Sequence, residues 1–149
     1  MREAYSYRTD PSIPDFPDAR PIIIFDGHCA LCSAWAQFVL RHDPHGRIRL
    51  LPAQTPLGHA LYVHYGLDPE DYQTNILIVD GLAWLKSEGS IRMAETLGFP
   101  WSLAAIVRVL PLPLRDRLYE YIARNRFRVF GRREICYLTD QKYADRFLV

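Results

Sequence analysis

The amino-acid sequence predicts an α/β protein with a mixed four-stranded sheet and additional helices in its C-terminal third. Three observations support this fold class. Short apolar, β-branched runs alternate with segments of helical periodicity, which is typical of a β-α-β unit with parallel strands. Two further apolar runs flank an Asp-Gly pair, which predicts an antiparallel hairpin. The 149 residues, 49% of them hydrophobic, are enough for one domain with its own core.

The first strand and helix are marked by the residues that compose and interrupt them. Residues 21–25 read Pro-Ile-Ile-Ile-Phe, a run typical of a strand that is buried on both faces. Residues 29–42 contain neither Gly nor Pro, and their apolar positions recur with the spacing of one buried helix face. The sequence Asp-Pro-His-Gly at 43–46 ends this helix. Residues 1–20, with three prolines and no periodicity, are expected to form an extended arm outside the single domain 21–149.

The remaining chain adds a strand, a helix and a hairpin before the C-terminal helices. A second strand is expected at 48–51 and a weaker helix at 57–66. The runs 76–79 and 82–85 enclose the Asp-Gly pair, where glycine tolerates the positive φ that a tight turn requires. The predicted order is β-α-β-α-β-β-α with extra C-terminal helices, which is the thioredoxin-like arrangement. The C-terminal helical patterns lie near 90–97, 102–110 and 114–125.

Composition and charge limit the classes of function. The net charge is +1, although residues 1–100 carry 8 Lys and Arg against 12 Asp and Glu, while residues 101–149 carry 10 against 5. The protein therefore lacks the large overall positive charge that would favour the binding of nucleic acid. The longest apolar stretch, 103–114, is interrupted by Arg108 and two prolines, so no membrane span is expected. Three cysteines cannot form a closed disulfide framework and no apolar leader is visible, so we expect a cytoplasmic protein.

The strongest chemical signal is Cys29-Ala-Leu-Cys32, at the predicted boundary between the first strand and the first helix. Cysteines three residues apart at a helix start share a face and can close a small disulfide ring. Unpaired N–H groups and the helix dipole favour the thiolate there, which is the reactive form. We therefore expect Cys29 to attack a substrate disulfide and Cys32 to resolve the mixed disulfide, without a cofactor. The alternative is a metal-binding or interaction module, for which His28 and Cys136 would be the obvious additional metal ligands.

Three neighbouring residues carry secondary predictions. Asp26 is expected either to accept the Cys32 proton, directly or through water, or to cap the turn and helix start by accepting backbone N–H bonds. Gly27 is expected to allow a turn geometry that other residues disfavour. His28 is either an exposed turn residue or, when protonated, a group that stabilises the Cys29 thiolate.

The segment just before the hairpin is the predicted place for substrate to dock. Thioredoxins have a cis-proline there, but residues 72–75 of this chain contain no proline, and a cis peptide is rare without one. We expect Thr74 and Asn75 to present backbone groups to a substrate from an ordinary trans loop.

Two features of the C-terminal third leave alternatives open. Residues 124–133 contain five arginines interleaved with aromatic residues, a composition that can bind nucleic acid or an acidic surface. The chain-wide charge balance instead favours the solvated end of a helix, where Arg lies near the last carbonyls. Cys136 lies beside Ile135, Tyr137 and Leu138, so it is predicted to be a buried small hydrophobe.

The heptapeptide from Asp26 to Cys32, which follows an apolar strand, resembles the signature of the DCC family of predicted thiol–disulfide oxidoreductases. The family is named for that Asp and the two Cys. The resemblance spans roughly residues 21 to 138 and implies a thioredoxin-like fold, a redox role, and a protein or small-molecule thiol or disulfide as partner. Further matches are Leu110-Pro111, Leu114-Arg115-Asp116, Tyr119, Ala123-Arg124-Asn125-Arg126, Phe130-Gly131-Arg132 and Cys136.

Overall fold

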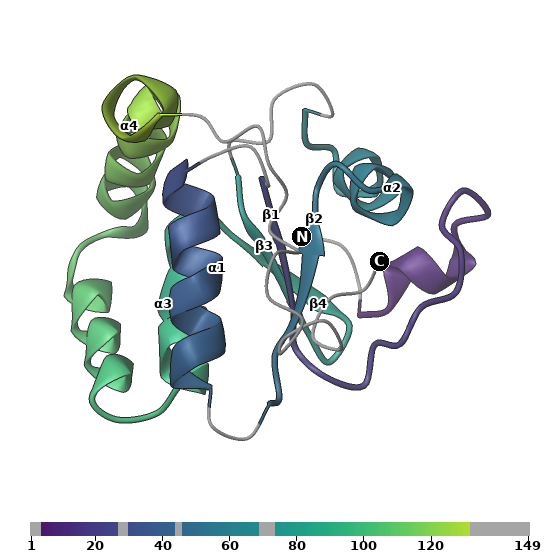
Figure 1. Ribbon diagram of the computed structural model, residues 1–149, viewed down its shortest axis with the longest axis horizontal. Helices are drawn as coiled ribbons and strands as arrows, with labels where there is room; N and C mark the ends of the chain where they lie inside the picture. The colour runs from purple at the N-terminus through teal and green to yellow at the C-terminus, as the bar shows by residue number, and fades with distance from the viewer. Residues whose placement is uncertain (1–3, 27–29, 44–45, 69–73, 132–149) are drawn as a thin grey trace.

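The centre of the fold is a mixed sheet of four strands in the order β2-β1-β3-β4 (Figure 1). The structure is a computed structural model and describes residues 4–26, 30–43, 46–68 and 74–131. Strand β1 pairs in parallel with β2 and antiparallel with β3, which pairs antiparallel with β4. This is the thioredoxin-like sheet that the sequence predicts. The strands are β1 (Ile22–Phe25), β2 (Arg49–Pro52), β3 (Ile76–Val79) and β4 (Leu82–Leu85).

Helices cover both faces of the sheet and add an outer layer on one side. In Figure 1, α1 and α3 lie on one face, α2 and the short η1 lie on the other, and η2 and α4 lie beyond α1 and α3. None of the described helices is long and apolar enough to cross a bilayer. The helices are η1 (Ser6–Thr9), α1 (Ala30–His42), α2 (Pro56–His64), α3 (Lys86–Thr96), η2 (Trp101–Val109) and α4 (Leu112–Phe130).

The side chains of β1 divide the core into two halves. Successive residues of a strand point to opposite faces. Ile23 and Phe25 accordingly join the half under α1 and α3, and Ile22 and Ile24 join the half under α2. All four β1 side chains are fully buried, as the uninterrupted apolar run predicts. Asp26, which follows directly, is thereby held at the end of the central strand.

The turn between β3 and β4 has the geometry that the Asp-Gly pair predicts. Asp80 and Gly81 have φ values of 51° and 78°, the left-handed region that a two-residue hairpin turn requires. The carbonyl oxygen of Gly81 accepts a hydrogen bond of 2.9 Å from the backbone N–H of Tyr5. A side chain at position 81 would collide with Tyr5, because a Cβ there would lie 2.5 Å from Cγ of Tyr5.

The N-terminal segment differs from the extended arm that its prolines suggest. It contains η1, and its Tyr7 and Ile13 are buried in the half of the core under α2. One polar cluster links residues within the segment, and a second links the segment to α2. Asp18 accepts hydrogen bonds from Tyr7 and Arg8, and His64 of α2 contacts Ser6 and Asp10. The segment thus lies against the domain, with Tyr7 and Ile13 in the core under α2.

The residues at the starts of α2 and α3 explain where these two helices begin. Helix α2 begins at Pro56, and the Thr55 hydroxyl caps it by accepting a 3.0 Å hydrogen bond from the N–H of Gly58. Helix α3 follows β4 with no intervening loop and begins at Lys86, four residues earlier than its apolar periodicity indicates. Gly89 makes this tight connection possible, because a Cβ there would lie 2.6 Å from the carbonyl oxygen of Trp84.

Candidate active site

Cys32 lies in the first turn of α1, which begins at Ala30. Its side chain is buried, with 7% of the residue exposed. Cys29, Gly27 and His28 lie outside the described residues, and so does Cys136. Their predicted roles, including the geometry of the cysteine pair, therefore remain predictions.

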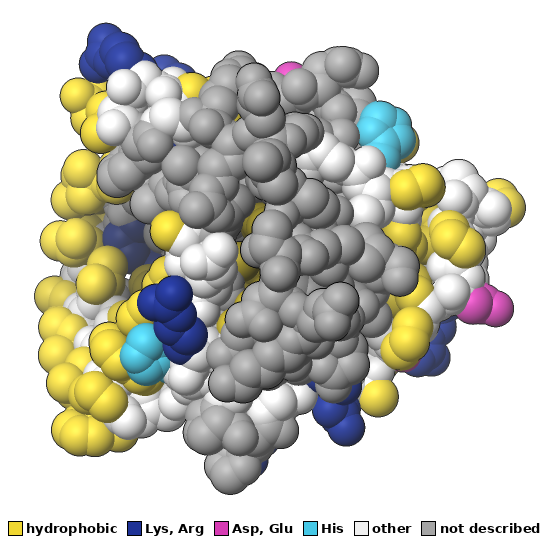
Figure 2. Space-filling model, viewed as in Figure 1, with side chains coloured by type: hydrophobic (Ala, Val, Ile, Leu, Met, Phe, Trp, Pro, Cys, Tyr) yellow, Lys and Arg dark blue, Asp and Glu magenta, His cyan; other side chains and the backbone are white. Residues whose placement is uncertain are grey.

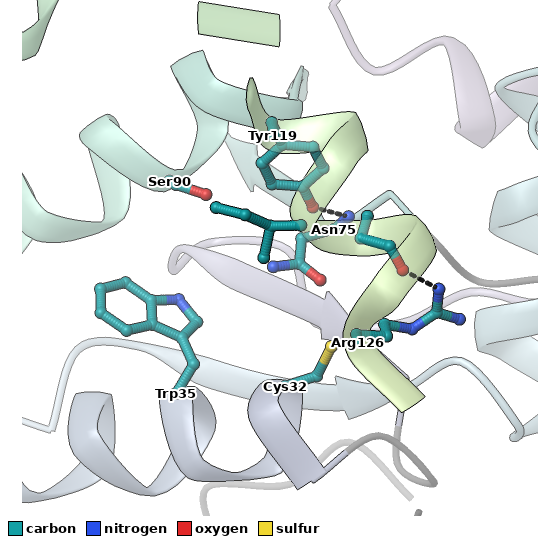
Figure 3. Close-up of a pocket in the computed structure, with 8 residues that line it drawn as sticks. Cys32, Trp35, Asn75, Ser90, Tyr119 and Arg126 are labelled. Atoms are coloured by element: carbon teal, nitrogen blue, oxygen red, sulfur yellow. Dashed lines mark hydrogen bonds between the residues drawn. The ribbon is translucent and has the colours of Figure 1, made fainter. Parts of the chain in front are cut away.

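A pocket of about 210 Å³ opens beside Cys32 (Figure 3). Four elements build it: α1, the residue before β3, α3 and α4. Its lining is mostly apolar, and its polar atoms come from few side chains. Such a lining, with a few fixed polar groups, is typical of sites that bind small ligands or substrate side chains. The lining residues are Cys32, Trp35, Asn75, Ser90, Tyr119, Ile122, Ala123 and Arg126.

Trp35 forms the pocket wall that lies one helical turn after Cys32. Its indole Nε1–H points to the sulfur of Met93 in α3, at a distance of 3.2 Å. Its ring stacks on Phe38, with 5.3 Å between the ring centroids. These contacts fix the indole against the core, as the apolar stripe of the helix predicts, and leave one side of it facing the pocket.

Asn75 is the polar centre of the pocket and is one of the predicted substrate-binding residues. Figure 3 shows its side chain between Tyr119 and the α1 residues Cys32 and Trp35. Its backbone N–H donates a 2.9 Å hydrogen bond to the Tyr119 hydroxyl. Its Oδ1 is buried and has no hydrogen-bond partner among the residues that the structure describes. A buried carbonyl oxygen of this kind favours a ligand that brings a donor to it.

The backbone carbonyl of Thr74, the other predicted docking residue, is occupied within the chain. It accepts a hydrogen bond from the hydroxyl of Tyr62 in α2. Burial raises the pKa of Tyr62, and the nearby Tyr119, Cys32 and Asp26 add to this effect. Tyr62 therefore stays protonated and keeps donating. A substrate would have to share this oxygen through its second lone pair or use other groups of Thr74.

Asp26 is linked to α4 by a buried ion pair. Arg126 donates from a guanidinium nitrogen to Oδ2 of Asp26 over 3.2 Å, and Gln54 donates to Oδ1 over 2.6 Å. The same guanidinium donates to the carbonyl oxygen of Ala123. A buried carboxylate requires such partners, because an isolated charge is costly to remove from water. Arg126 also lines the pocket, so it connects Asp26 with the surroundings of Cys32.

The sequence did not predict that Tyr119, Arg126 and Gln54 belong to this region. The chain-wide charge balance favoured the solvated end of a helix for residues 124–133, and the exposed Arg124 and Arg128 fit that interpretation. Arg126 instead faces inward, because it lies on the same side of α4 as Tyr119 and Ala123. One signal was available: Tyr119 and Arg126 are both among the residues that match the DCC family.

The metal-binding alternative concerns residues that the structure describes only in part. Across the described ranges, no group of three or more His, Cys, Asp or Glu side chains is arranged to hold a metal ion. The sulfur ligands that such a site would need at 29 and 136 lie outside those ranges. The alternative is therefore left to experiment.

Comparison with known proteins identifies the family. The sequence model of the DCC1-like thiol-disulfide oxidoreductases matches residues 23–132. The chain is 34% identical to the Bacillus subtilis protein YuxK, described as uncharacterized, over 85% of this chain and 93% of YuxK. It is 36% identical to a DCC family protein of Arabidopsis thaliana, described as chloroplastic, over 81% of this chain and 71% of the relative. No solved structure matches. The chain thus belongs to the DCC1-like thiol-disulfide oxidoreductase family.

Proposed function

We propose that this protein exchanges disulfides with a protein or small-molecule substrate through Cys29 and Cys32. The observation that carries the proposal is the position of Cys32, in the first turn of α1 and at the wall of an apolar pocket. The family supports a thiol–disulfide redox function in general. The specific pair and its mechanism are our inference from the spacing of the two cysteines.

The reaction needs only the two sulfurs and the substrate disulfide. The Cys29 thiolate attacks one sulfur of the substrate, the substrate S–S bond breaks, and the other substrate sulfur leaves as a thiolate. Cys32 then loses its proton and attacks the mixed disulfide at Cys29, which releases the second substrate thiol. The Cys29–Cys32 pair has lost two electrons and the substrate has gained two. The reverse sequence oxidises a dithiol substrate.

The pocket supports the second step because it brings a substrate close to the resolving thiol. Asn75 Oδ1 offers an acceptor to a substrate N–H, while Trp35 and Ile122 offer apolar contact. Asp26 is the proposed acceptor for the Cys32 proton, directly or through water. Arg126 balances the charge of that carboxylate in the reduced protein.

Single cysteine variants of the full chain test the proposal. With dithiothreitol as reductant, the parent should reduce insulin disulfides, and Cys29→Ser should lose this turnover because it lacks the nucleophile. Cys32→Ser should retain the first step and accumulate a mixed disulfide with the substrate at Cys29, which mass spectrometry detects.

Controls separate this proposal from its alternatives. Cys136→Ala should reduce insulin at close to the parent rate, because the two-cysteine cycle does not require it. Unchanged turnover in both Cys29→Ser and Cys32→Ser would refute the proposal. Stoichiometric zinc that protects the cysteines from alkylation in the purified protein would instead support the metal-binding alternative.

A further inference from the structure

The outer layer of the fold exposes an unusual amount of apolar surface. Among the described residues, every exposed large apolar side chain except Val63 lies between Phe99 and Val129. Figure 2 shows these side chains along the edge of the molecule that η2 and α4 occupy. We call this surface the η2–α4 face and define it by Leu103, Ile106 and Val109 of η2 and Leu114, Leu118 and Val129 of α4.

The apolar side of α4 points away from the protein. Leu114, Leu118 and Val129 recur at helical spacing and are 45%, 51% and 65% exposed, while Ala123 and Arg126 are buried. A helix that only covers a core has the opposite arrangement, with its apolar stripe inward. Helix η2 is mostly apolar and has no buried residue at all. Contiguous apolar patches of this extent usually mark a binding surface.

The charges on the same side of α4 are all positive. Arg117, Arg124 and Arg128 are exposed, follow one another at helical spacing beside the apolar stripe, and form no ion pair with another side chain in the described ranges. The two acidic residues of α4 point towards α3. Asp116 accepts a 2.6 Å hydrogen bond from Ser87, and Glu120 accepts one of 2.6 Å from Lys86. The outward side of α4 therefore attracts a negatively charged partner.

The orientation of η2 is fixed by ion pairs on its inner side. Arg108 donates to Glu88 and Glu95 of α3 over 3.0 and 2.6 Å. This network keeps the polar side of η2 against the protein and holds Ile106 and Val109 outward. The apolar side chains of η2 are therefore exposed because the ion pairs of Arg108 orient the helix in this way.

We propose that the η2–α4 face binds the surface of an anionic lipid bilayer. An apolar stripe flanked by arginines is the pattern of helices that lie in the membrane interface, where apolar side chains enter the lipid and basic ones meet the headgroups. Exposed Phe99 and Tyr121, 81% and 61% exposed, suit the same interface. A symmetric second copy fits less well, because pairing this face with itself brings rows of arginines together. The proposal does not depend on the redox chemistry.

Vesicle co-sedimentation of the full-length protein tests the proposal. The protein should bind phosphatidylcholine vesicles that contain phosphatidylserine, and binding should weaken as salt is added. Vesicles of phosphatidylcholine alone should retain little of it. Changing Arg117, Arg124 and Arg128 to Gln should lower the partition coefficient roughly 100-fold, about fivefold for each arginine.

Matched variants show whether the apolar stripe takes part. Leu118→Gln combined with Val129→Gln should abolish sedimentation with the vesicles, while Val63→Gln, at a position of similar exposure on α2, should not. Circular dichroism checks that each variant is folded. Binding to neither vesicle, or equal binding to both, would overturn the proposal. So would a dimer in analytical ultracentrifugation that Leu118→Gln dissociates, which would assign the face to a second copy.

Discussion

Arg126 and Asp26 form a buried ion pair that joins the C-terminal half of α4 to the end of the central strand β1. The donor nitrogen and Oδ2 are 3.2 Å apart, and the two side chains are only 3% and 4% exposed. Removing one partner of such a pair is far more damaging than replacing both, because a buried charge is left without its counter-charge.

Arg126→Met should therefore destabilise the protein by roughly 3–5 kcal/mol. Asp26→Asn alone should also be destabilising, and Arg126→Met combined with Asp26→Asn should recover part of the loss, since no buried charge remains. The free energies of unfolding, measured in urea, give the coupling energy between the two residues. Arg124→Met, at an exposed position of the same helix, is the control and should be nearly neutral. Additive effects of the two single variants would contradict an energetic link between Arg126 and Asp26.

Tyr119→Phe should cost roughly 1–3 kcal/mol, although it removes a single oxygen atom. The Tyr119 hydroxyl accepts the backbone N–H of Asn75, and without it this N–H at the start of β3 has lost its acceptor. Thermal unfolding measures the effect. Tyr121→Phe provides a control on the same helix, because the Tyr121 ring is largely exposed. If the two variants are equally stable, the bond to Asn75 contributes nothing.

Gly58→Ala should destabilise the protein by roughly 1–3 kcal/mol, because it overpacks the contact between α2 and β2. The direction of the stability change is informative, because replacing Gly by Ala inside a helix usually stabilises the helix by about 1 kcal/mol. A Cβ at position 58 would contact the carbonyl oxygen of Pro52 and lie 2.8 Å from Cα of Ala53. Both are backbone atoms and cannot rotate away. Val63→Ala, at an exposed site of α2, should be close to neutral, and a stabilised Gly58→Ala would show that α2 shifts freely.

The N-terminal segment should bind less tightly to the rest of the domain at acid pH. Hydrogen bonds from Ser12 and His64 lower the pKa of Asp10 from 3.8 to about 2. A carboxyl with a lowered pKa stabilises the folded state above pH 3.8, and this contribution is lost as the pH falls towards about 2. Asp10→Asn should therefore remove part of the acid sensitivity in that window.

The measurement is the free energy of unfolding at a series of pH values for the parent and for Asp10→Asn. Their difference should shrink as the pH falls through the window. Asp15→Asn, a change at an exposed carboxyl in the same segment, serves as the control. A difference that stays constant with pH would show that the Asp10–His64 contact does not support the docked segment.

Local sequence signals predicted the sheet well, because each depends on neighbouring residues. The hairpin strands 76–79 and 82–85 have the predicted bounds, since the Asp-Gly turn fixes the register of both. The helix expected at 29–42 is observed from Ala30 to His42, between a buried strand and a Pro-Gly break. These features follow from periodicity and turn chemistry alone.

Contacts between distant segments could not be predicted in the same way. The Asp26–Arg126 pair joins residues 100 positions apart, and no local pattern distinguishes Arg126 from the exposed Arg124 and Arg128. The docking of residues 4–20 depends on two apolar side chains, Tyr7 and Ile13, whose spacing matches neither a helix nor a strand. Of the residues at the site, the sequence pointed to Asp26 and Cys32 near the start of the first helix and to Asn75 before the hairpin, but not to their neighbours on α4.

Helix α4 packs only shallowly against the rest of the protein, so we expect it to detach more readily than the helices that pack directly on the sheet. Among the α4 side chains that the structure describes, Ala123 and Arg126 alone are buried, so few apolar contacts oppose its detachment. Detachment would break the bonds to Asp26 and Asn75 together and uncover Cys32 without unfolding the sheet. The rate at which a bulky alkylating reagent reaches Cys32 in the native protein would then report a local opening equilibrium. A bound bilayer that holds α4 in place would slow that reagent.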